Sequence, residues 1–303
     1  MKKKYRSFVF LISLFILFVT LTRVDTSWAI IPKISGGLFH TIFLRSDGTL
    51  WAWGYNAHGQ LGDRTKKDKT SPVQIGKDNQ WVSIAAGGFH TVALKSDGTL
   101  WAWGANFFGQ LGDGTRRDKT FPVQIGKDNQ WVSIAAGSFH TIALKSDGTL
   151  WAWGASLDDR KGRKKRFGKT SPVQMGKDNN WVSITAGGGN TLALKSDGTL
   201  WAWGNNRHGQ LGDGTKVAKP SPVQINMEKW ISIATSGGHT VALKTDGTLW
   251  AWGANAIGQL GDGTTVAKTS PVQINKGKRA SIATSGSHPV PLKSVKKLGG
   301  LAS

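Results

Sequence analysis

The distribution of apolar and polar positions predicts a hairpin in the middle of the chain. Residues 90–104 read His-Thr-Val-Ala-Leu-Lys-Ser-Asp-Gly-Thr-Leu-Trp-Ala-Trp-Gly, with two apolar runs on either side of a polar turn. Val92 and Leu94 share one face of the first run, and Trp101 and Trp103 share one face of the second, as the period of a β-strand requires. Asp-Gly between them favours a tight turn, because both residues tolerate a left-handed backbone. We therefore expect two antiparallel strands that are apolar on both faces.

The same stretch returns almost unchanged at residues 40–54, 140–154, 190–204 and 239–253. A repeat of this length is typical of propellers and other arrays. Residues 81–87 include several small side chains and are predicted to form the innermost strand of a unit. Residues 122–125 open with a proline and are predicted to form an edge strand. Stacking such sheets in a ring covers both apolar faces. The predicted fold is therefore all-β, a β-propeller of four-stranded blades.

Five complete units of about 50 residues are expected at 31–75, 81–125, 131–175, 181–225 and 230–274. A damaged sixth unit follows, in which two prolines interrupt the hairpin and the paired tryptophans do not return. The propeller domain is thus placed at residues 30–293, before an irregular tail at 294–303. A smaller closed ring, an open arc, a truncated product and assembly with another chain are the alternatives for ring closure.

Residues 1–29 have the features of a secretory signal peptide. A basic start precedes 14 mostly apolar residues, and Ser27 and Ala29 place small side chains before a cut after Ala29. The apolar run is shorter than the ~20 residues that a spanning helix needs, and an uncleaved membrane anchor is the alternative. We expect a secreted, periplasmic or cell-surface protein. The chain has no cysteine, which excludes disulfides and thiolate chemistry.

The net charge of +21 comes mostly from loops. It indicates attraction to anionic surfaces such as nucleic acid, phospholipid or acidic polysaccharide, and a solubilising loop surface is the alternative. The loop residues that we predict to contact a partner are Lys66, Lys67, Arg116, Arg117, Arg160, Lys161, Arg163, Lys164, Lys165 and Arg166.

A loop with the sequence Gly-Gln-Leu-Gly-Asp-Gly follows most of the hairpins, for example at residues 109–114. Its leucine is predicted to pack back onto the blade; no P-loop lysine or following helix supports phosphate binding. In the third unit Lys161 replaces the leucine and Arg163 the aspartate. This loop is either a contact site for an anionic partner or an exposed tip that tolerates change.

Histidine and tryptophan recur at fixed positions, and we predict structural roles for both. The histidines are expected to bond the backbone of their own or the next blade, a role that Asn190 can share in the remaining unit; a metal-binding ring is the alternative. Each tryptophan buries roughly 150–250 Å² in a core, and exposed indoles that stack on sugars or bases are the alternative. These residues are His40, His90, His140, His239, Trp51, Trp53, Trp101, Trp103, Trp151, Trp153, Trp201, Trp203, Trp250 and Trp252.

The pattern Gly-x-x-His-Thr-x-Ala-Leu-Lys-x-Asp-Gly-Thr-Leu-Trp-x-Trp-Gly, followed by Gly-Gln-Leu-Gly-Asp-Gly, resembles the regulator of chromosome condensation repeat over residues 31–293. The tryptophan-rich form is similar to bacterial members. The resemblance implies a propeller, usually of seven blades. The family's nucleotide exchange on a nuclear small GTPase is not expected, because the chain begins with an export signal. A secreted bacterial propeller that inhibits β-lactamases through one face is a closer analogy, which transfers no target.

The sequence therefore predicts a non-enzymatic, exported module that binds an unknown protein or anionic polymer through its basic loops. Nucleic acid is possible on charge alone, no cofactor or small-molecule substrate is expected, and an oligomer follows if the ring is incomplete. No Ser-His-Asp order, His-Glu-x-x-His or nucleophile elbow occurs. The alternatives are an inhibitor of an extracellular enzyme and a lyase or hydrolase with its site in the axial channel.

Overall fold

The computed structural model describes residues 30–155, 168–275, 281–285 and 288–292, which form five four-stranded antiparallel sheets and one two-stranded sheet. The first two blades contain β1 (Lys33–Gly36), β2 (His40–Leu44), β3 (Leu50–Gly54), β4 (Lys69–Gln74), β5 (Trp81–Ala86), β6 (His90–Lys95), β7 (Leu100–Gly104) and β8 (Lys119–Gln124). The third and fourth contain β9 (Trp131–Ala136), β10 (His140–Lys145), β11 (Leu150–Gly154), β12 (Lys169–Gln174), β13 (Trp181–Ala186), β14 (Asn190–Lys195), β15 (Leu200–Gly204) and β16 (Lys219–Gln224). The fifth contains β17 (Trp230–Thr235), β18 (His239–Lys244), β19 (Leu249–Gly253) and β20 (Lys268–Asn275).

The predicted hairpin is confirmed, with a different turn. In the second blade β6 pairs with β7 from His90 opposite Gly104 to Leu94 opposite Leu100. The amide of Gly98 donates to the carbonyl of Lys95 at 3.0 Å, and only Gly98, with φ of 79°, has a positive φ in this turn. The loop therefore has three residues and ends in a left-handed glycine; Asp97 does not adopt the left-handed backbone that its sequence suggested.

The two apolar faces of each sheet pack against neighbouring sheets, as predicted. Ile42, Leu44 and Ala52 of the first blade form one buried cluster with Ala93 and Trp103 of the second. Equivalent clusters join the second blade to the third and the fourth to the fifth. Since apolar burial is the main favourable term in folding, each blade is stabilised by its neighbours.

The strand order within each blade follows the sequence from the axis outward. The inner strands β1, β5, β9, β13 and β17 contact one another in succession, which confirms the position predicted for the small-residue strand. The outer strand also occupies the predicted edge. It begins three residues earlier than expected, at Lys119 in the second blade, so Pro122 lies within it. An edge strand tolerates this because the missing N–H faces outward.

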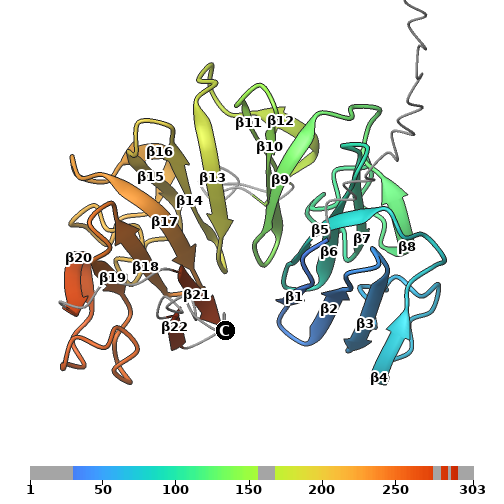
Figure 1. Ribbon diagram of the computed structural model, residues 1–303, viewed down its shortest axis with the longest axis horizontal. Coiled ribbons are helices and arrows are strands. Elements are labelled where there is room, and N and C mark those ends of the chain that lie inside the picture. Colours follow the sequence, from blue (N-terminus) through green and yellow to red (C-terminus); the bar gives the residue numbers. More distant parts are fainter. Residues whose placement is uncertain (1–29, 156–167, 276–280, 286–287, 293–303) are drawn as a thin grey trace, which may run out of the picture.

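The last unit is incomplete within the described residues. β21 (Ser281–Ser285) pairs with β22 (His288–Leu292), and β21 packs against β17 and β18 of the fifth blade. Figure 1 shows the blades in an arc, with β1–β4 at one end and β21–β22 at the other. The predicted signal peptide and the tail at 294–303 lie outside the described residues. No helix in the part of the chain that the structure describes has the length and hydropathy to cross a membrane.

Candidate interaction surface

Each blade has two ends with different chemistry. In the first blade, one end is formed by the connection before His40 and the loop of residues 55–68, since His40 pairs with Gly54. We call this the histidine end of the propeller. The hairpin turns and the connections between blades form the opposite end, where the amide of Ser96 donates to the carbonyl of Gln80. Figure 1 shows both sets of connections at the rims of the sheets.

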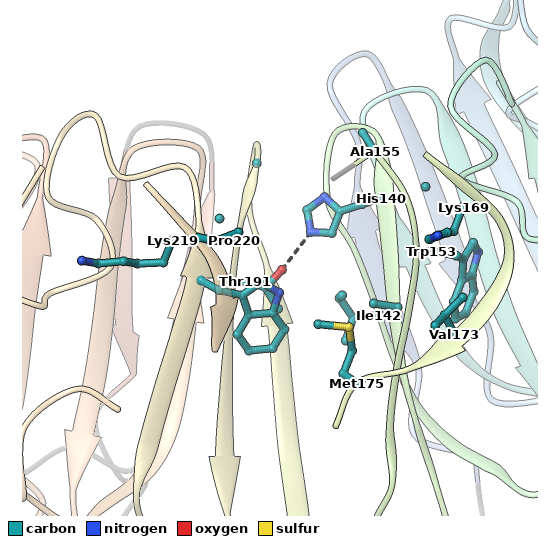
Figure 2. A pocket seen from close by; sticks show the side chains of 15 residues that line it. His140, Ile142, Trp153, Ala155, Lys169, Val173, Met175, Thr191, Lys219 and Pro220 are labelled. Carbon is teal, nitrogen blue, oxygen red and sulfur yellow. Dashed lines mark hydrogen bonds between the residues drawn. The ribbon is translucent and has the colours of Figure 1, made fainter. Parts of the chain in front are cut away.

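The histidines at this end link successive blades. The Nε2 atom of His90 lies 3.0 Å from the hydroxyl of Thr141 in the next blade, and Thr141 donates to the carbonyl of Gln110 at 2.7 Å. Because that hydroxyl hydrogen is used, Nε2 must carry the imidazole proton. Figure 2 shows the same bond from His140 to Thr191. The partner is thus a side chain of the next blade, and the expectation of a backbone partner was wrong.

Burial keeps these imidazoles neutral. It lowers the pKa of His40 and His140 to about 4 and that of His90 to about 3, with a smaller effect of the neighbouring histidines on His90. In the fourth blade Asn190 donates from Nδ2 to the hydroxyl of Thr235 in the fifth blade at 2.7 Å. An amide, which carries no charge at any pH, therefore also links its blade to the next, but through Thr235 at the end of the inner strand and not through Thr240, the counterpart of Thr141.

The long loops at this end are held by a repeated polar network. In the second blade, Asn106 accepts from the amide of Leu111 and donates from Nδ2 to Asp113 and to the carbonyls of Thr115 and Arg117. The network fixes the loop, so its leucine is completely buried between two blades. The sequence predicted the buried leucine and missed the asparagine, although it recurs at Asn56, Asn206 and Asn255.

The predicted basic residues divide into two groups. Lys66, Lys67, Arg116 and Arg117 are exposed at the histidine end of the first two blades. The others lie outside the described residues; they are Arg160, Lys161, Arg163, Lys164, Lys165 and Arg166. Of the exposed group, Arg116 donates from its guanidinium to the carbonyl of Gly168, at the start of the last strand of the third blade.

A row of exposed aromatic side chains lies on the same end and was not predicted. Phe39, Phe89 and Phe139 precede the histidines of the first three blades, with ring centroids 5.9 Å apart between Phe39 and Phe89 and 6.5 Å apart between Phe89 and Phe139. Phe39 is 63% exposed and Phe139 37% exposed. The fourth and fifth blades have glycine at this position. A residue that breaks the repeat in some units and is large and apolar was the available signal.

Further aromatic rings extend this row toward the basic loops. Tyr55 packs edge-on against Phe39, and His58 lies against Phe89 and Phe107, with Phe107 52% exposed. The aromatic row is defined here as Phe39, Tyr55, His58, Phe89, Phe107, Phe108 and Phe139. Exposed aromatic and arginine side chains are the types most enriched at protein interfaces.

The aspartates of the hairpin turns and of the long loops have structural roles. Asp97 accepts from the amide and hydroxyl of Thr99, and the hydroxyl, followed by the amide, lowers its pKa. Burial favours a raised pKa for Asp113, but hydrogen bonds from Thr115, Lys119 and Asn106 outweigh it and lower that pKa. Both groups are therefore ionised at neutral pH. Among the described residues no three histidine or carboxylate side chains lie close enough to hold a metal.

The tryptophans pack within and between blades. Trp103 and Trp252 are fully buried, whereas Trp101 is half-buried at the opposite end of its blade. There the ammonium of Lys95 lies 4.2 Å from the Trp101 ring centroid and pairs with Asp78. The lysine caps the indole by a cation–π contact, and the same arrangement recurs at Lys145, Lys195 and Lys244.

Stacked four-stranded sheets with ordered connections at both rims define a β-propeller. The model of the RCC1-like domain family matches residues 18–298, and the chain belongs to this family.

Similar proteins share the fold more widely than the sequence. Human WBSCR16 superposes with a TM-score of 0.75 at 22% identity, over 86% of this chain and 72% of that one. Prp20p from Saccharomyces cerevisiae superposes with a TM-score of 0.75 at 24% identity, over 88% and 69%. The ultraviolet-B receptor UVR8 of Arabidopsis thaliana is 51% identical over 45 residues, which are 15% of this chain and 10% of UVR8.

The X-linked retinitis pigmentosa GTPase regulator homologue of Caenorhabditis elegans is 40% identical over 57 residues, which are 18% of this chain and 4% of that protein. The matches to these two curated relatives thus span one tenth of their length or less. They establish the repeat and leave the activity of this chain to be argued from its own surface.

Proposed function

We propose that the protein is a non-catalytic interaction module, exported from the cell, that binds a macromolecule through its histidine end. The observation that carries the proposal is the aromatic row on the first three blades. Two of the loops that contribute to the row also carry the exposed basic side chains Lys66, Lys67, Arg116 and Arg117. A large apolar patch with a charged rim supports a protein partner. Prp20p, which has the same fold, is described with binding properties to Gsp1p and histones.

The predicted export signal supports a partner outside the cytoplasm, and the positive rim supports an acidic one. The non-catalytic part of the proposal is supported by the hydrogen-bonded aspartates of the turns and loops, such as Asp113, and by the buried histidines of the repeat, such as His90, whose pKa values are lowered. His58 and Asp118, whose Nδ1 and Oδ2 atoms lie 3.0 Å apart, form a partly exposed pair at the histidine end, and we include them in the proposed binding surface.

The test measures binding of the full chain to an array of acidic proteins, acidic polysaccharides and anionic vesicles at rising salt. We expect one class to bind, with affinity that falls as salt rises. The double variant Phe39→Ser and Phe139→Ser should weaken binding at all salt concentrations, and Arg116→Glu with Arg117→Glu should weaken it most at low salt.

The charge-matched control is Lys77→Glu with Lys127→Glu, two exposed lysines at the opposite end of the blades. The affinity of this control should stay within about twofold of that of the unchanged protein, since both lysines are remote from the proposed binding surface. Equal losses for the control and the histidine-end variants, or binding that ignores both salt and the phenylalanines, would contradict the proposal.

A further inference from the structure

One contact between the first two blades departs from the repeat on both of its sides. Between the second and third blades, the long loop places a glycine over a serine of the next outer strand, and a Cβ atom on Gly114 would lie 4.0 Å from the hydroxyl of Ser171. The same pair recurs between the fourth and fifth blades, at 3.7 Å. Between the first and second blades the equivalent residues are Arg64 and Phe121. Two positions that meet in space have therefore changed together.

Arg64 keeps the backbone conformation of the glycine that it replaces. Its φ is 68°, against 80° for Gly114 and 81° for Gly214. Its amide donates to the carbonyl of Thr120 at 2.8 Å, as the amide of Gly114 donates to that of Thr170. This left-handed region is unfavourable for a residue with a Cβ atom. A strained residue of this kind points to a use for its side chain.

The guanidinium group of Arg64 is held at the surface by an aromatic ring. Its Cζ atom lies 4.9 Å from the ring centroid of Phe121, which is 40% exposed. A cation–π contact uses none of the N–H donors of arginine. The neighbouring carboxylate, Asp63, pairs with Lys69 at 3.2 Å, and within the described part of the chain no carboxylate forms an ion pair with Arg64. Its donors can therefore bind an anion from outside.

A cavity of about 260 Å³ lies at this contact, between the outer strands β4 and β8. Figure 1 shows both strands on the outer side of the arc. Besides Arg64 and Phe121, the cavity is lined by Gly62, Gln74 and Pro122. The two rings supply an apolar wall, and the amide of Gln74 supplies further N–H donors. Pockets for drug-sized ligands have ~300–1,000 Å³, so this cavity fits one small group.

The charge of the wall selects a monoanion. A guanidinium group binds a carboxylate through two parallel N–H···O bonds, which are stronger than bonds between neutral groups. A dianion such as a phosphate monoester carries more charge than Arg64 offsets, and it would lie near the carboxylate of Asp63, which also lines the cavity. The apolar wall favours a carboxylate that is attached to an apolar or aromatic group.

We propose that the cavity between the outer strands of the first two blades is a carboxylate-binding site. Arg64 binds the carboxylate through its paired N–H groups, and Phe121 and Pro122 contact the apolar group beside it. Two sources have this chemistry: the C-terminal residue of a polypeptide and a small carboxylic acid. No residue of the aromatic row lines the cavity, so the site is separate from the surface of the proposed function.

The probe is a fluorescent peptide, Gly-Ser-Gly-Ser-Phe with a free C-terminus, compared with the same peptide amidated at its C-terminus. Binding to the full-length protein is followed by fluorescence anisotropy at low salt. We expect the carboxylate to bind at least about tenfold more tightly than the amide, because only the carboxylate forms charge-assisted bonds with arginine. Displacement by 3-phenylpropanoate would show that a small acid suffices, and resistance to it that a polypeptide C-terminus is required; either result supports the carboxylate site.

The repeat itself supplies the variants. Arg64→Gly and Phe121→Ser restore residues that other blades carry, so both proteins should fold. Arg64→Gly should bind the two peptides equally weakly, and Arg64→Lys should lose most of the preference because an ammonium group lacks the planar fork. Thermal unfolding of Arg64→Gly should occur at the same or a higher temperature, since glycine relieves the strained backbone.

Arg45→Lys is the matched control. Arg45 also lies over an aromatic ring, 5.7 Å from the centroid of Trp51, but it pairs with Asp47, and the other blades carry lysine at its position. This variant should bind both peptides like the unchanged protein. The double variant Phe39→Ser and Phe139→Ser should do the same, because the aromatic row is not part of the site.

Three results would overturn the inference: equal affinity for the two peptides, an unaltered preference in Arg64→Gly, and no binding of either carboxylate probe at millimolar concentration. A lower unfolding temperature of Arg64→Gly with unaltered binding would assign the Arg64–Phe121 contact a structural role only. Failure of the array ligands to bind the histidine end, with a retained preference for the carboxylate peptide, would reject the proposed function and support this site.

Discussion

At the scale of single residues, the glycine three positions before the histidine lets the backbones of adjacent blades approach closely. A Cβ atom on Gly87 would lie 2.6 Å from the carbonyl oxygen of Gly137 and closer still to the ring of His90, so the backbones of adjacent blades meet there without a side chain between them. The fifth blade is the exception, and there the hydroxyl of Ser236 lies 2.8 Å from Nδ1 of His239.

The buried histidines make stability depend on pH. The folded pKa of His90, about 3, lies below its value of 6.5 in the unfolded chain, so the unfolded state binds more protons at mildly acid pH. The contribution of His90 is then fully present above pH 6.5 and is lost as the pH falls toward 3. Between pH 7.5 and pH 5, we expect each such histidine to account for about 2 kcal/mol of the fall in unfolding free energy.

Urea unfolding at the two pH values measures this fall. The variant His90→Asn copies the residue that the fourth blade uses naturally, and should lose about 2 kcal/mol less between pH 7.5 and pH 5 than the unchanged protein. The hydrogen-bonded aspartates have lowered pKa values and titrate below this window. An identical pH dependence in both proteins would show that the imidazole is not held neutral.

At the scale of elements, the long loop is as much a part of the core as the strands. Leu211 is completely buried between the fourth and fifth blades, while Val217 in the same loop is 64% exposed. Leu211→Ala should lower the free energy of unfolding by about 2–5 kcal/mol, because it removes buried methyl groups and leaves a cavity. Val217→Ala should change it by less than about 0.5 kcal/mol.

Urea unfolding at pH 7.5 compares these two variants. Because both residues belong to one loop, a general effect of loop mutation would appear in both. Equal stabilities for the two variants would mean that the leucine is replaceable by solvent and that the loop is an ordinary surface connection.

The hairpin and the plug were predictable because both are local. Period-two alternation and Asp-Gly identify the hairpin, and an isolated leucine in a glycine-rich loop has few uses other than burial. The turn type was not predictable, since Asp-Gly is compatible with two loop lengths. Contacts between non-equivalent residues were also missed: Arg64, which holds φ of 68° where other loops have glycine, stacks 4.9 Å above Phe121 of the next blade. The sequence shows that Arg64 and Phe121 both depart from the repeat, but it does not show that they are in contact.

The candidate site was predicted in part for the same reason. Charge marked Lys66, Lys67, Arg116 and Arg117 as loop residues, and their exposure follows from their position outside the strands. The aromatic row depends on the stacking of blades, which brings positions 50 residues apart within a ring's width of each other. Only the three-dimensional array shows that they form one surface.

At the scale of the whole molecule, the array is quasi-one-dimensional, so its stability is close to a sum of blade and interface contributions. At the position of the buried leucine the third loop has Lys161, and among the described residues the interface between the third and fourth blades lacks the loop leucine that the other complete interfaces have. It should therefore be the weakest of the complete interfaces, and the first three blades and the following two should open as separate cooperative units.

Native-state hydrogen exchange resolves these units. In the unchanged protein, we expect β9–β11 and β13–β15 to exchange with different opening free energies. Replacing residues 156–167 by the sequence of residues 106–117 should merge them into one unit. The same replacement with alanine at the leucine position should stabilise this interface by at least about 2 kcal/mol less than the replacement with leucine. The difference between the two separates the effect of the buried leucine from that of loop composition. A single cooperative unit in all three proteins would mean that the His140–Thr191 bond and the remaining contacts across this interface already couple the two halves without a plug.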